Sequence, residues 1–343
     1  MRIAQIAPLY ESCPPKLYGG TERIVSYLTE ELVRQGHEVT LFASGDSETA
    51  ARLVAGSEVA LRLNPAIRDA IPYHVIALDQ VMRRAEEFDV LHFHVDMLHF
   101  PLIRHLADRT VTTLHGRLDL PDLQPFYRAF PEIPLISISN AQRRPMPGCV
   151  TWAGTVLHGL PRDLLPFSAA PEDGYLAFLG RISPEKRPDR AIEIAAKIDK
   201  ADQAYWDKEI APLIAAHANV EYVGEIDEHQ KAAFLGNASG LLFPIDWPEP
   251  FGMVMIEAMA CGTPVIAMPC GSVPEVIEHG VTGFIVDTEE EAIAAVGRLP
   301  ELDRAQVRAA FDRRFTGRRM AEDYVRLYEH LIALRQPMRL KLA

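Results

Sequence analysis

The sequence is poor in cysteine, and its thiols lack the spacing of a metal or redox site. Four cysteines are scattered over 343 residues, without a C-x-x-C pair. This excludes a zinc ribbon or a disulfide-stapled protein and indicates a reducing compartment. Apolar runs of 18 residues are absent, and residues 1–7 begin as a strand pattern rather than as a signal sequence. We therefore expect a soluble, cytoplasmic protein without a transmembrane segment.

Positive charge is also scarce. The chain has 35 Lys and Arg against 47 Asp and Glu, a formal net charge of −12. Nucleic-acid binding depends on Lys and Arg that neutralise phosphates, so no nucleic-acid partner is expected. General adhesion to anionic lipid is disfavoured for the same reason, although peripheral membrane contact through a local basic patch stays open.

Two common nucleotide-binding motifs are missing. No P-loop is present, and Gly19-Gly20 lacks the complete G-x-G-x-x-G pattern of dinucleotide-binding folds. The second predicted strand ends at Ala43 without the acidic residue that would bind the ribose of a nicotinamide cofactor. A nicotinamide dehydrogenase is therefore only a third alternative, and we expect no cofactor.

Metal-binding patterns are weak. No D-x-D motif ends a strand. His92 and His94 share one strand face near Asp96 and His99, so metal binding there is conceivable, but no distant set of ligands accompanies them. We expect no metal.

What the sequence does contain is an alternation of apolar runs and helical patterns. Predicted strands cover residues 2–9, 38–43, 89–94, 110–115, 135–139 and 152–158, and then 175–180, 220–223, 240–243, 264–267 and 283–286. Helical patterns cover residues 21–34, 188–198, 230–237, 253–260, 289–298 and 320–334. Continuous apolar strands separated by helices predict an α/β protein with parallel sheets covered on both faces. Residues 45–75 show no clear pattern.

A proline-rich break divides the chain. Pro161, Pro166 and Pro171 interrupt the pattern, so residues 161–171 are predicted to be a linker. We expect two Rossmann-like, doubly wound domains facing a central cleft, with boundaries at 1–163 and 164–319. Ligands of such domains bind near the carboxyl ends of the strands.

The most informative segment is 249–267. Glu249 and Glu257 flank a strand-to-helix turn, Gly252 permits close approach of a ligand, and the N–H groups of Met253 and Val254 at the helix start favour an anion. Carboxylates beside an anion site suit a ligand that also offers hydroxyl groups. An acidic surface loop followed by a packed helix explains these residues equally well.

A basic turn follows the predicted strand 175–180. Arg181 and Lys186 are suited to a diphosphate leaving group, and Glu185 is placed to hold Lys186. Taken alone, this spacing is more often a solvated turn.

Two features of the N-terminal half point to the same kind of ligand. Gly19 and Gly20 open a helix and allow backbone N–H groups to approach a phosphate. His115 ends a strand, where it can bind a sugar hydroxyl or a phosphate or serve as a structural histidine.

Together these residues resemble glycosyltransferase family 4 over nearly the whole chain, most specifically at residues 249–267. The resemblance implies a GT-B fold, with an acceptor-side N-terminal domain, a nucleotide-sugar domain at 164–319, and a final helix at about 320–343 that packs back onto the first domain. It implies that Glu249 contacts the hydroxyls of the donor sugar, Glu257 the ribose, and His115 the region of the donor sugar. Arg181, Lys186, Gly20 and the backbone of Gly252-Met253 match the family's diphosphate and phosphate contacts.

The chain departs from the family pattern at three places. His158-Gly159 stands where Asn-Gly is common, and Arg187-Pro188 where a glycine follows the lysine. Residues 189–199 are too few for the usual helix, turn and strand, which indicates either a lost strand or an omitted segment.

The function predicted is retaining transfer of a sugar from a UDP- or GDP-sugar to an unidentified saccharide or small-molecule acceptor, with the nucleotide sugar as co-substrate. The alternatives are a sugar-nucleotide epimerase or disaccharide phosphorylase of the same fold, and a non-catalytic nucleotide-sugar-binding protein. The sequence leaves the donor base and sugar, the acceptor and the oligomeric state open.

Overall fold

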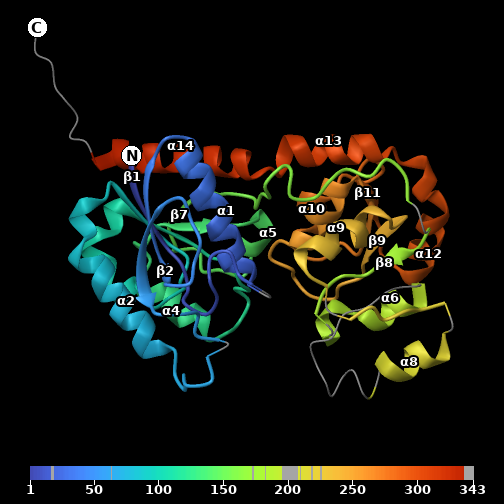
Figure 1. Ribbon diagram of the computed structural model, residues 1–343, viewed down its shortest axis with the longest axis horizontal. Helices are drawn as coiled ribbons and strands as arrows, with labels where there is room; N and C mark the ends of the chain where they lie inside the picture. The colour runs from blue at the N-terminus through green and yellow to red at the C-terminus, as the bar shows by residue number, and fades with distance from the viewer. Residues whose placement is uncertain are drawn as a thin grey trace, which may run out of the picture. The chain divides into compact units, whose positions relative to one another are not determined.

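The computed structural model describes residues 1–16, 19–62, 64–171, 174–181, 183–194, 208, 210–217, 219–224 and 226–335. The chain divides into two compact units, which Figure 1 draws with their helices and strands labelled. Unit 1 contains Met1–Ile138, Arg143–Gly159 and Gly317–Ala343, and unit 2 contains Ser139–Gln142 and Leu160–Thr316. The C-terminal segment thus belongs to the unit built from the N-terminal half.

Unit 1 is built around a parallel sheet of seven strands in the order β3-β2-β1-β4-β5-β6-β7. The strands are β1 (Arg2–Ile6), β2 (Glu38–Ser44), β3 (Arg52–Ser57), β4 (Val90–Phe93), β5 (Thr110–Thr113), β6 (Leu135–Ser137) and β7 (Trp152–Thr155). The chain order reverses between β1 and β4, and open sheets of this kind bind ligands beyond the carboxyl strand ends at such a point. Six of these strands were predicted, and β3 lies in the stretch without a clear pattern.

Helices cover both faces of this sheet. They are α1 (Gly20–Arg34), α2 (Ile71–Arg83), α3 (Phe100–Ile103), α4 (Leu123–Ala129) and α14 (Gly317–Arg335). The apolar stripe of α1 is buried as its spacing predicts, and α1 packs against α14. Gly36, with φ of 84°, supplies the left-handed turn after α1 that L-residues rarely adopt. None of the described helices is long and apolar enough to cross a membrane.

Unit 2 contains a smaller parallel sheet of four strands in the order β11-β10-β9-β8. The strands are β8 (Leu176–Ala177), β9 (Gly240–Phe243), β10 (Val265–Ala267) and β11 (Gly283–Ile285). The helices are α6 (Pro188–Ile194), α8 (Ala211–Ala216), α9 (Glu228–Gly236), α10 (Met253–Cys261), α11 (Val273–Val276), α12 (Glu289–Arg298) and α13 (Arg304–Arg314), and the short α5 (Asn140–Arg143) begins in this unit. The parallel α/β class expected for both halves is confirmed.

Two strand predictions in unit 2 are met only in part. Residues 220–223 form no named strand in the described structure, where only Glu221 forms a bridge. The run at 175–180 shortens to β8, because only Leu176 and Ala177 pair with β9. An apolar run forms a strand only where a neighbour offers backbone partners in register. The prediction that residues 189–199 are too few for a helix, a turn and a strand lies partly outside the described residues, which end at Ile194 on this side.

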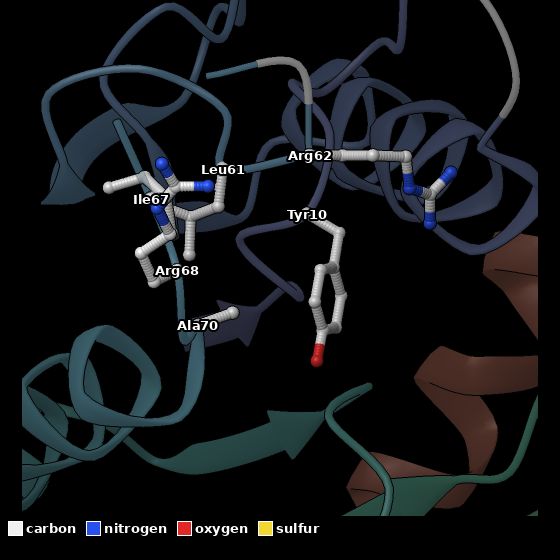
Figure 2. Close-up of a pocket in the computed structure, with 6 residues that line it drawn as sticks. All are labelled: Tyr10, Leu61, Arg62, Ile67, Arg68 and Ala70. Atoms are coloured by element: carbon white, nitrogen blue, oxygen red, sulfur yellow. The ribbon is translucent and has the colours of Figure 1, made fainter. Parts of the chain in front are cut away.

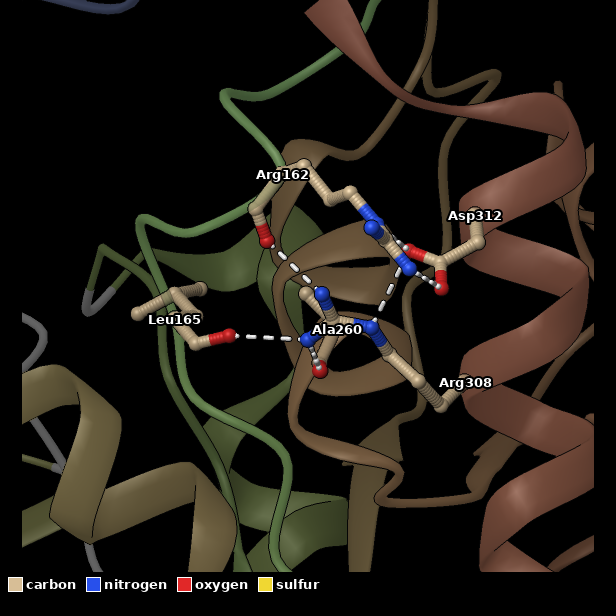
Figure 3. A network of polar contacts seen from close by, with 5 residues as sticks. All are labelled: Arg162, Leu165, Ala260, Arg308 and Asp312. Carbon is tan, nitrogen blue, oxygen red and sulfur yellow. Dashed lines mark hydrogen bonds and ion pairs between the residues drawn. The ribbon is translucent and has the colours of Figure 1, made fainter.

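The segment predicted to be a linker, residues 161–171, is hydrogen-bonded to a helix of unit 2. The guanidinium of Arg308 donates hydrogen bonds to the carbonyl oxygens of Arg162, Leu165 and Ala260 at 2.7, 3.0 and 2.6 Å, and pairs with Asp312 at 3.1 Å (Figure 3). Arg162 itself pairs with Asp312 at 3.1 Å. Arg308 on α13 thereby holds this proline-containing stretch against α10. No local sequence pattern predicts this contact.

Candidate active site

The acidic loop of unit 2 lies between β9 and α10. Gly252 precedes the first residue of α10 with φ of 75°, and a Cβ there would lie 2.7 Å from Met255 Cε and 3.1 Å from Phe243 Cζ. Glycine is therefore required by both backbone conformation and packing. Among the described residues, no side chain caps α10, so its first N–H groups, which include those of Met253 and Val254, can meet an anion.

The basic loop contacts the acidic loop directly. Lys186 forms a hydrogen-bonded ion pair with Glu249, and the two side chains are only 15% and 11% exposed. The ammonium also lies 4.8 Å from the centre of the Trp247 ring. A backbone hydrogen bond of 3.0 Å from Asp246 N to Glu185 O ties the loops together. Acidic and basic groups predicted from separate segments thus form one charged cluster within unit 2.

Arg181 has a different environment. It is 49% exposed and pairs with Glu185 at 3.4 Å. The sequence interpretation assigned Glu185 to Lys186, and this was wrong. Residues 184–186 form a short 3-10 helix, which places Glu185 beside Arg181 and leaves Lys186 to Glu249. The exposed guanidinium of Arg181 remains accessible to an anionic ligand.

Glu257 is buried on α10 and held by a lysine that sequence reasoning missed. Lys231 on α9 donates to Glu257 Oε1 at 2.8 Å and lies 3.6 Å from Glu228. Both side chains are mostly buried, with exposures of 14% for Lys231 and 6% for Glu257. No sequence pattern links residues 26 positions apart, so the pair could not be predicted.

A second glycine supports the acidic loop. Gly271 has φ of 58°, and a Cβ there would lie 2.2 Å from the carbonyl oxygen of Glu249. The next residue, Ser272, donates its N–H to the same oxygen at 3.0 Å and its hydroxyl to Phe251 O at 2.8 Å. The Gly-Ser pair shortly after the strand at 265–267 was a sequence signal that could have indicated this role, although it was not among the predicted site residues.

The glycine loop of unit 1 has an acidic neighbourhood. Gly19 packs so closely that a Cβ would lie 2.8 Å from Pro15 Cβ and 3.1 Å from Glu11 Cγ, whereas a Cβ on Gly20 would meet nothing within 4 Å. Glu11 and Glu22 are both buried, and burial raises the pKa of each carboxyl. Arg62 pairs with Glu11 at 3.3 Å. Close packing accounts for Gly19, and the carboxylates weigh against an isolated phosphate at this loop.

His115 lies just beyond the carboxyl end of β5, as predicted. Its Nε2 is 2.8 Å from His94 Nδ1, and its ring stacks on His158 with centroids 5.3 Å apart. Burial lowers the pKa of His115 to about 3 and holds the pKa of His94 well below its usual value. Both rings are therefore neutral near pH 7.

The possible metal ligands have other partners. His92 contacts Tyr328 OH at 2.6 Å and Thr113 Oγ1 at 2.7 Å, and His99 contacts Thr112 Oγ1 at 2.7 Å. In the part of the chain that the structure describes, no group of three His, Cys, Asp or Glu is arranged to hold a metal ion. The histidines instead belong to a hydrogen-bonded core.

Comparisons with known proteins agree with this arrangement. A family model described as Glycosyltransferase Family 4 matches residues 18–144, and one described as Glycosyl transferases group 1 matches residues 166–313. A phosphatidyl-myo-inositol mannosyltransferase of Mycolicibacterium smegmatis is 27% identical over 99% of this chain and 93% of that protein. A D-inositol 3-phosphate glycosyltransferase of Geodermatophilus obscurus is 31% identical over 46% of this chain and 39% of that protein.

Solved structures show the same fold. Sucrose-phosphate synthase from Thermosynechococcus elongatus superposes with a TM-score of 0.75 at 20% identity, covering 97% of this chain and 100% of that chain. Anabaena HepE in complex with UDP-glucose gives 0.71 at 16% identity, with 96% and 100% covered.

Two parallel α/β units with these structural matches define the GT-B fold. The chain belongs to glycosyltransferase family 4 and is a glycosyltransferase.

Proposed function

We propose that this glycosyltransferase transfers a sugar, with retention of anomeric configuration and without a metal, from a UDP- or GDP-sugar. The observation that carries the proposal is the buried contact of Lys186 with Glu249 beside the uncapped start of α10. The cation and the N–H groups of this cluster can bind a diphosphate, and its carboxylate can bind hydroxyl groups. A nucleotide sugar contains both chemistries in one molecule.

Each residue has a separate role in this proposal. Arg181 and Lys186 stabilise charge on the departing diphosphate together with the N–H groups of Met253 and Val254. Glu249 accepts hydrogen bonds from the hydroxyls of the donor sugar, and Glu257 from the ribose. Trp247 shields Lys186 from water and strengthens its interaction with an anion.

In unit 1, two residues are also proposed to bind ligand groups. Gly20 begins α1, and a Cβ added there would meet nothing within 4 Å, so its backbone N–H can meet a phosphate that is part of a larger ligand, although the carboxylates of Glu11 and Glu22 disfavour an isolated phosphate. His115 contacts the donor sugar.

The reaction proposed follows the retaining course that the family implies. The bond between the anomeric carbon and the diphosphate oxygen breaks, and the acceptor hydroxyl forms the new bond on the same face. The acceptor proton passes to an oxygen of the departing diphosphate. The protein supplies binding, orientation and charge stabilisation rather than a covalent nucleophile.

The acceptor proposed is a hydroxylated ring that carries a phosphate group. The names of the two relatives described above contain phosphatidyl-myo-inositol and D-inositol 3-phosphate. Unit 1 contains a pocket of about 330 Å³ lined by Tyr10, Leu61, Arg62, Ile67, Arg68 and Ala70. Figure 2 shows Arg68 and Tyr10 on opposite sides of this pocket; Arg62 pairs with Glu11, whereas Arg68 forms no ion pair among the described residues. An aromatic face and an unneutralised guanidinium suit such an acceptor.

Donor binding is the direct test. Titration calorimetry with UDP, GDP and ADP is expected to show micromolar binding by UDP or GDP. Arg181→Ala should weaken that binding by about 1–3 kcal/mol, because it removes a charge-assisted contact. Arg298→Ala is the matched control, since Arg298 is 53% exposed and pairs with Glu301 at 3.2 Å in the same unit. Absence of binding by all three nucleotides removes the proposal.

The alternatives differ in what they do with donor alone. A sugar-nucleotide epimerase converts the donor without an acceptor, and a phosphorylase consumes a disaccharide with inorganic phosphate. A binding protein binds the donor and leaves it unchanged even when acceptors are present. A transferase hydrolyses the donor only slowly until its acceptor is added.

A further inference from the structure

The backbone of the acidic loop is held at three consecutive carbonyl groups. Ser272 donates its N–H to Glu249 O at 3.0 Å and its hydroxyl to Phe251 O at 2.8 Å. The carbonyl oxygen between them, Pro250 O, accepts the hydroxyl of Ser139 at 2.6 Å. Both serines are fully buried. Because a buried carbonyl that loses its donor is costly, these two serines determine where the loop backbone lies.

Ser139 belongs to a short segment that the chain contributes to unit 2 from its N-terminal half. The chain leaves unit 1 after Ile138 and returns to it at Arg143, so only residues 139–142 belong to unit 2 here. The next residue of unit 2 along the chain is Leu160. Tertiary contacts, rather than sequence neighbours, therefore hold this segment in unit 2.

The carboxylate of Glu275 on α11 binds the segment. Glu275 Oε2 accepts from Asn140 N at 2.8 Å and from Asn140 Nδ2 at 3.0 Å, and Oε1 accepts from Ala141 N at 2.6 Å. Three donors thus converge on one carboxylate, and hydrogen bonds to a charged acceptor are stronger than neutral ones. Glu275 therefore fixes the backbone directly after Ser139.

The direction of each bond around Ser139 is determined by its partners. Gln142 N donates to Ser139 Oγ at 3.1 Å, and a backbone N–H can only donate. Pro250 O can only accept, so the single hydroxyl hydrogen of Ser139 must point to Pro250. Ser139 therefore connects residues 139–142 to the acidic loop through one defined hydrogen bond.

The same loop also contacts the stretch where the chain leaves unit 2 for the last time. Unit 2 ends at Thr316, and the ring of Phe315 packs against the edge of Phe251 with centroids 6.3 Å apart. Arg314 donates to the backbone carbonyl of Glu275. The acidic loop and Glu275 are thus both supported by residues at the ends of unit 2.

We propose that Ser139 and Glu275 are positioning residues, which set the place of the Glu249 carboxylate through the carbonyl group of Pro250. Among the described hydrogen bonds and ion pairs, neither side chain reaches the carboxylate of Glu249, so both act through the loop backbone. The contact of Glu249 with a donor sugar rests on the proposed function, but the placement of the loop does not.

This role predicts a difference between two parts of the donor. Glu257 and Arg181 lie outside the acidic loop and have their own partners, Lys231 and Glu185. A displaced loop should therefore impair the contact with the sugar while the nucleoside diphosphate keeps most of its binding groups.

Hydrogen exchange of the full chain without ligand, measured by mass spectrometry, tests the placement of the loop. Its peptides covering residues 246–255 contain the hydrogen-bonded amides of Asp246 and Glu249. Ser139→Ala and Glu275→Gln should each raise exchange there by about threefold or more. The glutamine of Glu275→Gln places an NH₂ group where the carboxylate accepted an N–H. The double variant should exchange no faster than the faster single variant, because both changes act on one carbonyl group.

The control for this measurement is Thr282→Val. Thr282 is fully buried in unit 2, and its hydroxyl accepts from Glu278 N at 2.9 Å. The control should leave exchange at residues 246–255 unchanged. An equal rise in Thr282→Val, unchanged exchange in either single variant, or additive effects in the double variant overturns the proposal. Thermal denaturation verifies folding, and Glu275→Gln, at a partly buried position, decides the matter if Ser139→Ala does not fold.

Turnover of the donor provides the second readout. Ser139→Ala should lower kcat by about tenfold or more, as expected when a contacting group is misplaced, while the Kd of UDP or GDP changes by less than about threefold. Thr282→Val should keep both values. An unchanged kcat, or an equal loss of kcat and nucleotide affinity, contradicts the positioning role. If the unsubstituted chain turns over no donor, the proposed function fails while hydrogen exchange still decides what places the loop.

Discussion

Lys231 Nζ lies 2.8 Å from Glu257 Oε1 and connects α9 to α10 beneath the candidate nucleotide site. Both side chains are largely buried, so each charge depends on the other for compensation. The pair fixes the carboxylate that is proposed to contact the ribose. Breaking this ion pair should therefore lower both the free energy of unfolding and the affinity for the donor.

Lys231→Met should reduce the free energy of unfolding by about 3 kcal/mol, because it leaves the buried Glu257 carboxylate unpaired. Urea denaturation measures this loss. Lys16→Met serves as the control, since Lys16 is 69% exposed in its pair with Asp46 and should cost less than about 1 kcal/mol. Adding Glu257→Gln to Lys231→Met should recover part of the stability. A double variant less stable than Lys231→Met alone would show that the charge is not the cause.

Gly252→Ala should destabilise unit 2 and weaken nucleotide binding. The substitution forces an L-residue into φ of 75° and places its Cβ 2.7 Å from Met255 Cε. Gly280→Ala is a matched control, because Gly280 has φ of 78° but a Cβ added there would meet no atom within 4 Å. Gly280→Ala should cost about 1–2 kcal/mol from backbone strain alone, and Gly252→Ala more. Equal losses measured by denaturation would mean that packing at Gly252 contributes nothing.

Glu249→Gln should lower kcat/KM for the donor by about a hundredfold or more, since it removes the charge that holds Lys186 and weakens the contact with sugar hydroxyls. Steady-state kinetics with varied donor measures the effect. Glu278→Gln is the control, because Glu278 pairs with Arg313 and Arg314 at 3.1 and 2.7 Å outside the cluster. A Glu249→Gln enzyme as active as Glu278→Gln would exclude the assigned role.

Stability should decline as pH falls from about 6.5 toward 5. The folded pKa of His115, about 3, lies below the value of about 6.5 in an unfolded chain, so the unfolded state binds more protons in this window. His115 alone should contribute a loss of about 1.4 kcal/mol for each pH unit below 6.5. Burial likewise lowers the pKa of His92, His94 and His158, so the total slope is steeper.

Denaturation at several pH values checks this expectation. His115→Phe keeps a ring for stacking on His158 but cannot titrate, so its stability should fall less steeply with decreasing pH. His330→Gln, at an exposed position on α14, controls for the loss of an imidazole and should follow the unsubstituted chain. Parallel curves for His115→Phe and the unsubstituted chain would contradict a lowered pKa of His115 in the folded state.

The sequence alone determined the fold class and most elements of both units. Apolar periodicity is a local property, so it located α12 at its observed bounds and β9 likewise. It also placed Glu249, Gly252 and Glu257 around one strand-to-helix turn, because chain order and a glycine are sufficient for that. The family followed from the same segment.

The tertiary structure alone decided which charges meet. The pairs Lys186–Glu249 and Lys231–Glu257 join residues 63 and 26 positions apart, and the contacts of His94 with Gln5 and His115 join residues on or just after three strands. The position of residues 161–171 likewise depends on a distant partner, the side chain of Arg308. Ion pairs and strand ladders form between segments that are distant in the sequence and meet only on folding. No periodic pattern in the sequence therefore predicts them.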